Sequence, residues 1–395
     1  MTGRRRAWST GAVGFSLLLS LAGCGGSPPG DPARVQVQQV LDRRSAALLR
    51  HDEAAYGVTG TRTQYIRLRA LPLASWSYRV TAVHRTASGA TADADLSYRV
   101  AGYDRAPVDA HRSLALGRTA DGRWYVTADR PAGKAGQQLW DQGTVTVVRG
   151  AHSLVLGTGG SAGGLKEFAR LADRAVPAVS GVWATEWSRR IVVLVPRTLA
   201  SMAALLGSPA AEYRGIAAVT TGEAGGPGRA PADRVVVNPE AYAVLGDVGK
   251  QVVLTHETTH VATRANTTAA TPLWLSEGYA DWVGYLGTGR TAAEAAPELG
   301  RAVRDGEPPE ALPTDADFGF TSEPTKLARA YESGWLACRM IADQWGPARL
   351  GAFYRDVGAH GKRAGAVEAA LEKVLGTTPR EFTRRWRDYV TTQLD

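Results

Sequence analysis

A five-residue pattern at positions 256–260, His-Glu-Thr-Thr-His, constrains the fold of this chain more than any other feature. It falls within a stretch at 242–264 whose periodicity predicts a helix, interrupted only near two glycines. Residues i and i+4 of a helix differ by about 40° around its axis, so His256 and His260 can reach one metal ion from the same face, with Glu257 beside it. An exposed helical turn with two histidines is the alternative, and the apolar residues on both sides argue against it.

A second predicted helix opens at 272–281 and supplies a candidate third ligand, Glu277, seventeen positions after His260. A catalytic zinc ion needs three protein ligands and an open fourth position for water. Asp281 follows Glu277 by four residues, so both carboxylates project from the same side of that helix. Taken alone, Glu277 is equally well explained as a carboxylate favoured by the positive end of the helix dipole.

Together these segments resemble the gluzincin metallopeptidases, most closely the aminopeptidase-N-like and peptidase MA-like group, in which a Trp-Leu-x-Glu-Gly-x-Ala segment carries the third ligand. The resemblance implies a zinc ion held by His256, His260 and Glu277. Glu257 is then the base that activates a water molecule. In gluzincins of the thermolysin kind, an aspartate at the offset of Asp281 accepts a hydrogen bond from a zinc-bound histidine, and a solvated helix charge is the alternative for this residue.

The resemblance covers 140–395 and includes Tyr-Glu-Ser-Gly at 331–334, which begins another predicted amphipathic helix. This segment looks like the Tyr-Glu-Lys-Gly segment of the aminopeptidase-N-like group, although serine replaces lysine here. The resemblance implies that Tyr331 donates a hydrogen bond to the oxyanion that forms when water attacks a carbonyl. Tyr279 and Tyr285 remain alternative donors, and a half-buried packing role is the other interpretation of a lone helical tyrosine.

The strand expected at 215–221 lacks the Met-Glu-Asn sequence with which aminopeptidase-N-like enzymes hold the free amine of a substrate. Aminopeptidase activity is therefore in doubt, but an edge strand here could pair with an extended peptide through backbone hydrogen bonds. The resemblance implies a zinc-dependent, peptidase-like hydrolase that acts on a peptide or protein; endopeptidase, carboxypeptidase and non-peptide hydrolysis all remain open. The rival is a non-catalytic lipoprotein that uses the metallopeptidase fold as a binding or assembly module, and the intact Glu257 argues against it. A third alternative makes the N-terminal domain the functional ligand binder.

The first 24 residues have the layout of a bacterial lipoprotein leader. Three arginines at 4–6 precede an apolar run at 12–21, and the following Leu-Ala-Gly-Cys, which ends at Cys24, resembles the lipobox. The resemblance implies a signal peptide at 1–23 and a mature, extracytoplasmic chain anchored to the bacterial cell membrane by lipid on Cys24. A flexible tether at 24–32 would follow. An uncleaved hydrophobic anchor is the alternative, although the apolar run is short for a membrane span.

The remaining pattern predicts an α+β fold in two domains. Helical periodicity at 33–56 and 62–70, followed by alternating strands, looks like the nuclear transport factor two-like fold, whose curved sheet would form an accessory domain at 33–130. A linker at 131–139 leads to a metallopeptidase-like domain at 140–395, with a small sheet and a helical C-terminal half. The strands expected in its sheet cover 153–156, 191–195, 215–221 and 234–238.

The charge argues against a nucleic-acid binder, and the cysteine content argues against a fold held together by intrachain disulfides. The net charge of +8 is modest for 395 residues, and no dense basic run with interleaved aromatic residues indicates a nucleic-acid binder. Cys338 is the one cysteine besides Cys24, so lipidation of Cys24 leaves no intrachain disulfide. Cys338 lies in an apolar helical stretch, which favours a small buried hydrophobe over a reactive thiol. The sequence gives no indication of the oligomeric state.

Overall fold

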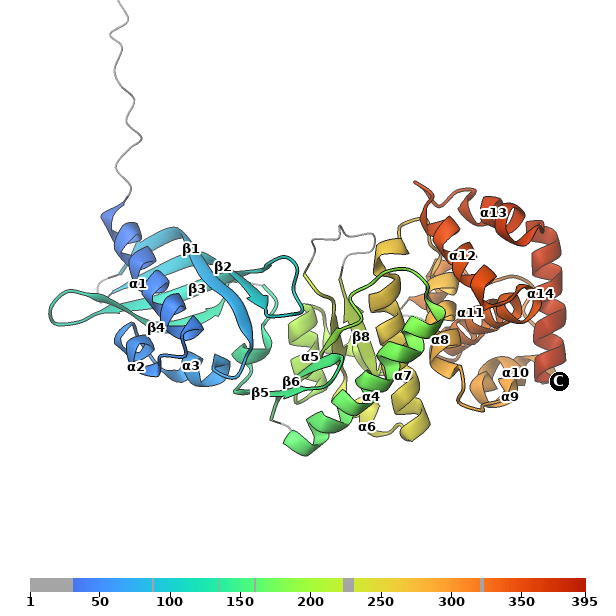
Figure 1. Ribbon diagram of the computed structural model, residues 1–395, viewed down its shortest axis with the longest axis horizontal. Helices are drawn as coiled ribbons and strands as arrows, with labels where there is room; N and C mark the ends of the chain where they lie inside the picture. Colours follow the sequence, from blue (N-terminus) through green and yellow to red (C-terminus); the bar gives the residue numbers. More distant parts are fainter. Residues whose placement is uncertain (1–30, 87–88, 134, 160, 223–230, 320–322) are drawn as a thin grey trace, which may run out of the picture.

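The computed structural model describes residues 31–86, 89–133, 135–159, 161–222, 231–319 and 323–395. The expected signal peptide at 1–23, Cys24 and nearly all of the expected tether at 24–32 lie outside these ranges, so the lipid anchor stays a prediction. Within the described ranges, no helix is long and apolar enough to cross a membrane. Figure 1 shows three parts in a row: an N-terminal sheet with its helices, a second sheet, and a helical C-terminal part.

The N-terminal part is an antiparallel sheet with three helices. Its four strands lie in chain order, and β2 (Ala90–Val100) buries every second side chain. Alternation in the sequence predicts these strands because successive side chains of a strand point to opposite faces of the sheet. Helix α1 (Pro32–Leu49) packs against the sheet, and its Leu41 shares a core with Trp76 and Leu96. The other elements here are α2 (Glu53–Val58), α3 (Thr63–Leu68), β1 (Leu73–Arg85), β3 (Val108–Arg118) and β4 (Trp124–Pro131).

Two features of this part differ from the sequence pattern. The single helix expected at 33–56 is two helices, because Asp52 accepts a hydrogen bond of 2.9 Å from the Ala55 amide and so caps the start of α2. The apolar core of the N-terminal part also extends beyond its own sheet, because Trp140 and also Val192 of the second sheet belong to the same core. The resemblance to a nuclear transport factor two-like domain, and the linker at 131–139, stay predictions.

The second sheet is mixed, with the strand order β5-β6-β7-β9-β8. Strands β6, β7 and β9 are parallel, and the edge strands β5 and β8 each run antiparallel to their neighbour. Four of these strands were expected, and β5 is an addition. Strand β8 begins three residues later than the expected 215. The bounds are β5 (Val145–Arg149), β6 (Ser153–Thr158), β7 (Ile191–Val195), β8 (Ala218–Thr221) and β9 (Arg234–Val237).

The helix expected at 242–264 is divided in two. A short α6 (Pro239–Ala243) begins after Asn238, whose side chain accepts from two backbone amides, and α7 (Asp247–Thr263) begins after Gly246. Gly246 has an extended backbone, which lets α7 start at Asp247 in a new direction. The second glycine, Gly249, lies inside α7 and does not interrupt it. Two further helices pack near the sheet, α4 (Ala162–Val182) and α5 (Leu199–Leu206).

The C-terminal half is helical and closes around one apolar core that includes Trp274, Tyr354 and Trp386. Helix α11 (Pro324–Trp345) begins at its proline rather than at the expected 331, because proline is pre-organised for the first turn of a helix. Cys338 is fully buried in this core, as predicted. Two sheets followed by a helical half make the α+β fold that the sequence predicted. The remaining helices are α8 (Leu273–Tyr285), α9 (Ala292–Ala295), α10 (Pro297–Arg304), α12 (Pro347–Gly358), α13 (Ala366–Ala370) and α14 (Pro379–Leu394).

Candidate metal centre

Helix α7 brings the two histidines of the 256–260 pattern to one side. The Nε2 atoms of His256 and His260 are 3.0 Å apart, and both imidazoles are largely buried, with exposed fractions of 12% and 17%. The apolar flank predicted from the sequence is present, since Val252 and Leu254 are buried. The spacing of four residues therefore directs both rings into the protein interior, where their nitrogen atoms converge.

Helix α8 contributes a third ligand atom to the same point. The Oε2 atom of Glu277 lies 3.2 Å from Nε2 of His256 and 3.3 Å from Nε2 of His260. A tetrahedral zinc ion with bonds of 2.0–2.1 Å holds its ligand atoms about 3.3–3.4 Å apart, so this triangle has the size that zinc requires. Among the described residues, His256, His260 and Glu277 form a group that could hold a metal ion.

Two glycines fix helix α8 against its neighbours. Gly284 faces α7, where an added Cβ would lie 3.2 Å from the backbone oxygen of Val252 and 3.8 Å from the Cβ of His256. Gly278 faces α11, where a Cβ would overlap the carbonyl group of Gly334. The absence of side chains at these positions lets three helices approach closely, which sets the position of Glu277 relative to both histidines.

Asp281 accepts a hydrogen bond of 2.7 Å at Oδ1 from Nδ1 of His256. A histidine that donates from Nδ1 keeps its Nε2 lone pair free, and this is the form that binds a metal. Burial lowers the pKa of His256, but the charge and hydrogen bond of Asp281, together with Glu277, outweigh burial and raise it well above its usual value. Burial raises the pKa of Glu277. The charges and hydrogen bonds of the two histidines have the larger combined effect and lower it to well below its usual range. The carboxylates of Asp281 and Glu277 thus surround the histidines with negative charge, which favours a bound cation, either a proton or a metal ion.

Glu257 lies beside this triangle but is not part of it. Its side chain is 6% exposed, and its Oε2 accepts a hydrogen bond of 2.6 Å from the hydroxyl of Thr220. Thr220 belongs to β8, the edge strand next to α7, and it also donates to the backbone oxygen of Glu257. The edge strand therefore holds this carboxylate in one orientation. The sequence offered no sign of Thr220, because 37 residues separate it from Glu257.

Tyr331 approaches the centre from α11. Burial, first of all, raises the pKa of its hydroxyl well above the usual value, and the charges of Glu277, Asp281 and Glu257 raise it further. The other two candidate tyrosines differ. The pKa of Tyr279 is raised by burial and by Cys338 and Tyr354, and that of Tyr285 by burial, Asp281 and Glu332. Of the three tyrosines, Tyr331 is the one whose pKa is raised by the charges of both Glu277 and Glu257.

Glu332, the neighbour of Tyr331, has a structural contact that the sequence did not predict. Its carboxylate accepts hydrogen bonds from the backbone amides of Glu298 and Leu299, at 3.3 and 2.5 Å, and so caps the start of α10. Burial raises the pKa of Glu332 to about 7, although the two amide hydrogen bonds oppose the shift. The protein therefore takes up a proton at this site on folding when the pH lies between the unfolded value of 4.5 and about 7.

We expect Glu332→Gln to flatten the pH dependence of stability. A carboxyl group with a raised folded-state pKa contributes stability that is complete below pH 4.5 and is lost as the pH rises through about 7. The loss is at most about 3 kcal/mol. Melting temperatures of the parent and the variant, measured from pH 5 to 8, should diverge in favour of the variant as the pH rises. Parallel curves would contradict a raised pKa at Glu332.

Comparisons with known proteins add little to this geometry. No family model matches the chain, and no curated protein sequence matches it. One match is to a mutant of a two-domain M1 zinc metallopeptidase bound to L-arginine. The matched region spans 82% of this chain and 95% of the metallopeptidase chain, with 12% identity and a TM-score of 0.35. A mutant M1 zinc metallopeptidase from Deinococcus radiodurans, bound to a Tyr-Ser-Ala substrate, covers 83% and 96% with the same identity and TM-score. Similarity this low carries no conclusion about the chain, so the function has to be inferred from the centre itself.

Proposed function

We propose that this protein is a zinc-dependent hydrolase of the gluzincin type that cleaves peptide bonds. The observation that carries the proposal is the triangle of His256, His260 and Glu277, with the non-ligating carboxylate of Glu257 beside it. A purely structural zinc site has its four positions filled by protein ligands and has no use for a base. Here three ligands leave one position open to water, and Glu257 lies next to it.

Zinc bound by these three residues would polarise the scissile carbonyl group and lower the pKa of a bound water molecule towards 7. Glu257 accepts the proton of that water and passes it to the leaving amine. Thr220 keeps the Glu257 carboxylate aimed at the water through its hydrogen bond. Asp281 holds His256 in the ligating form. Tyr331 donates a hydrogen bond from its hydroxyl to the oxyanion and keeps its proton.

Strand β8 gives the proposed substrate a place to bind. Among the described strands it pairs with β9 alone, so its other edge has no partner strand in this part of the chain. An extended peptide that added to this edge would run past Thr220 and so past Glu257. This arrangement supports a substrate that is a peptide in extended form.

We expect zinc content to test the ligand set directly. Purified residues 25–395 should contain close to one zinc ion per chain, and His256→Ala, His260→Ala or Glu277→Ala should each remove most of it, because each takes away one of three protein ligands. The matched control is His84→Ala, which changes an exposed histidine on the N-terminal sheet. Zinc per chain is measured by mass spectrometry of the metal. Full occupancy in the Glu277→Ala protein would remove Glu277 from the ligand set.

A further inference from the structure

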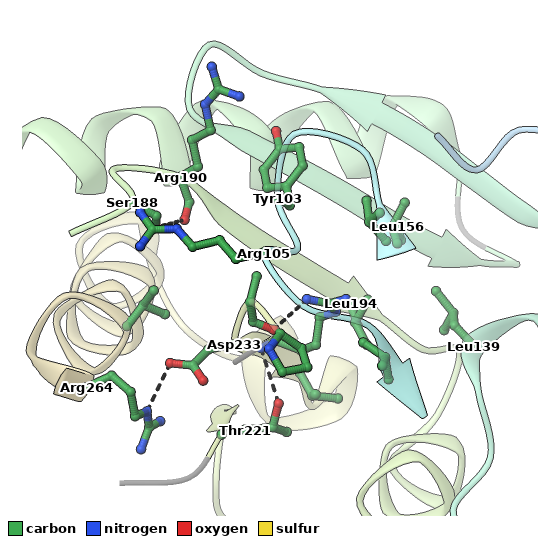
Figure 2. A pocket seen from close by; sticks show the side chains of 18 of the residues that line it. Tyr103, Arg105, Leu139, Leu156, Ser188, Arg190, Leu194, Thr221, Asp233 and Arg264 are labelled. Atoms are coloured by element: carbon green, nitrogen blue, oxygen red, sulfur yellow. Dashed lines mark hydrogen bonds and ion pairs between the residues drawn. The ribbon is translucent and has the colours of Figure 1, made fainter. Parts of the chain in front are cut away.

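A cavity of about 680 Å³ lies where the N-terminal sheet meets the second sheet, and the proposed hydrolysis does not use it. Its wall combines residues that are far apart in the chain, among them Tyr98 of β2, Trp140, Leu194 of β7 and Arg264 just after α7. Figure 2 labels Leu194 and Arg264 among the residues of this wall. Pockets of this volume, formed between two parts of a protein, commonly hold a small molecule.

Much of the wall is apolar and rigid. Leu139, Leu156 and Val236 line the cavity from the 3-10 helix at 139–141 and from the second sheet, and all three are buried. Tyr98 and Trp140 meet edge to face, with ring centroids 5.0 Å apart. These side chains belong to well-packed elements, so the cavity is formed before any ligand enters. The wall favours a ligand with an apolar body.

The cavity wall has more positively charged residues than negatively charged ones. Arg234 forms an ion pair of 2.9 Å with buried Asp104, and Arg264 forms one of 2.9 Å with Asp233. Arg105 and Arg190 have no carboxylate partner among the described residues; Arg190 donates to a backbone oxygen, that of Gly102, at 3.2 Å. This bond places Arg190 beside the loop that carries Arg105, and Figure 2 shows both away from the Asp233–Arg264 pair.

One acid, Glu186, remains in the wall against these two arginines. The unpaired part of the wall therefore carries a net charge of +1, two guanidinium groups less one carboxylate. A guanidinium group recognises a carboxylate through two parallel hydrogen bonds. The charge distribution favours a ligand with one anionic end.

We propose that this cavity is a binding site for a small amphipathic carboxylate, with its apolar body between the two sheets and its carboxylate at Arg105 and Arg190. The ligand site is separate from the metal ligands, although Val261 and Arg264 of its wall lie one and four positions after His260 in the chain. Binding here does not depend on zinc, so this proposal and the proposed hydrolysis can fail independently.

The test uses dodecanoate as the probe and residues 25–395 as the protein. Trp140 and Trp187 line the cavity, so their fluorescence should change on binding, and calorimetry should give one site per chain. Dodecanol, which has the same chain without the charge, should bind at least about 10-fold more weakly, because it lacks the carboxylate that the two guanidinium groups recognise. No saturable binding up to about 1 mM dodecanoate would overturn the proposal.

Substitutions locate the carboxylate. Arg105→Gln combined with Arg190→Gln should weaken dodecanoate binding at least about 10-fold and leave dodecanol binding unchanged. Both arginines are exposed, so the fold should tolerate the change. Arg123→Gln is the matched control, since Arg123 is an exposed arginine of the N-terminal sheet that lies outside the cavity. Equal binding of dodecanoate and dodecanol, unaffected by the double substitution, would show an apolar crevice without carboxylate recognition. His256→Ala should bind dodecanoate like the parent.

Discussion

Glu257→Gln is expected to lower the rate of peptide hydrolysis by at least about 100-fold while zinc stays bound. Glutamine has the shape of glutamate and can still accept the hydrogen bond from Thr220, so the local structure should persist. It cannot accept a proton from water, and it is not one of the three metal ligands. The measurement is steady-state kinetics on the best peptide from a library digest, together with zinc content and thermal melting.

Tyr331→Phe provides the companion variant for the same mechanism. It removes a hydroxyl that acts on charge present only in the transition state, so kcat should fall by about 100-fold with KM and zinc nearly unchanged. Tyr285→Phe is the matched control, because Tyr285 lies near Asp281 but is not affected by Glu277 or Glu257. A Glu257→Gln protein as fast as the parent would refute the mechanism. A parent that holds zinc and cleaves nothing in a broad library would instead support the non-catalytic binding module.

The part of the centre that the sequence predicted best is the part fixed by local geometry. His256, Glu257 and His260 lie on one helix, so their relative positions follow from the helix repeat alone. Glu277 comes from another helix, and its place beside the histidines followed from the resemblance to gluzincins rather than from spacing. The position of Asp281 then followed from that of Glu277, because residues four positions apart on a helix lie on the same face.

Thr220 and Glu332 could not be found in this way. Thr220 lies on a strand, and its hydrogen bond to Glu257 exists because β8 packs against α7. Glu332 belongs to the Tyr-Glu-Ser-Gly segment at 331–334, but its partners are amides of α10, which lie 33 and 34 residues away. Contacts of this kind depend on tertiary packing, which a single sequence does not encode as a readable period.

The fold shows the same division. Long alternating runs predicted β1 to β4, whereas β5 was not predicted, because it has only five residues and lies between Gly143 and Gly150. The helix at 242–264 was expected to weaken at two glycines, yet only Gly246 breaks it. A glycine within a helical pattern can end the helix, be tolerated, or permit close packing, and the neighbouring element decides among these outcomes. Gly278 permits close packing, between α8 and α11, and its replacement is expected to have the largest effect.

Gly278→Ala is expected to destabilise the protein by about 3 kcal/mol and to lower its affinity for zinc. The added methyl group would overlap the carbonyl of Gly334, which belongs to the backbone of α11 and cannot move without moving the helix. Gly334 in turn leaves little room, since a Cβ there would lie 2.7 Å from the backbone oxygen of Trp274. Helices α8 and α11 would have to separate, and Glu277, the residue before Gly278, would move away from the histidines.

The same substitution in an open position gives the control. Gly181 lies in α4 with nothing within 4 Å of an added Cβ, so Gly181→Ala should stabilise the protein slightly, by up to about 1 kcal/mol, through its helix propensity. Urea unfolding of both variants, with and without added zinc, separates packing from propensity. If added zinc stabilises the Gly278→Ala protein less than it stabilises the parent and the Gly181→Ala protein, then the close approach of α8 and α11 is what positions the third ligand. A Gly278→Ala protein that unfolds at the same urea concentration as the parent would show that the contact with Gly334 can relax, and that Glu277 is positioned by its packing against α7 instead.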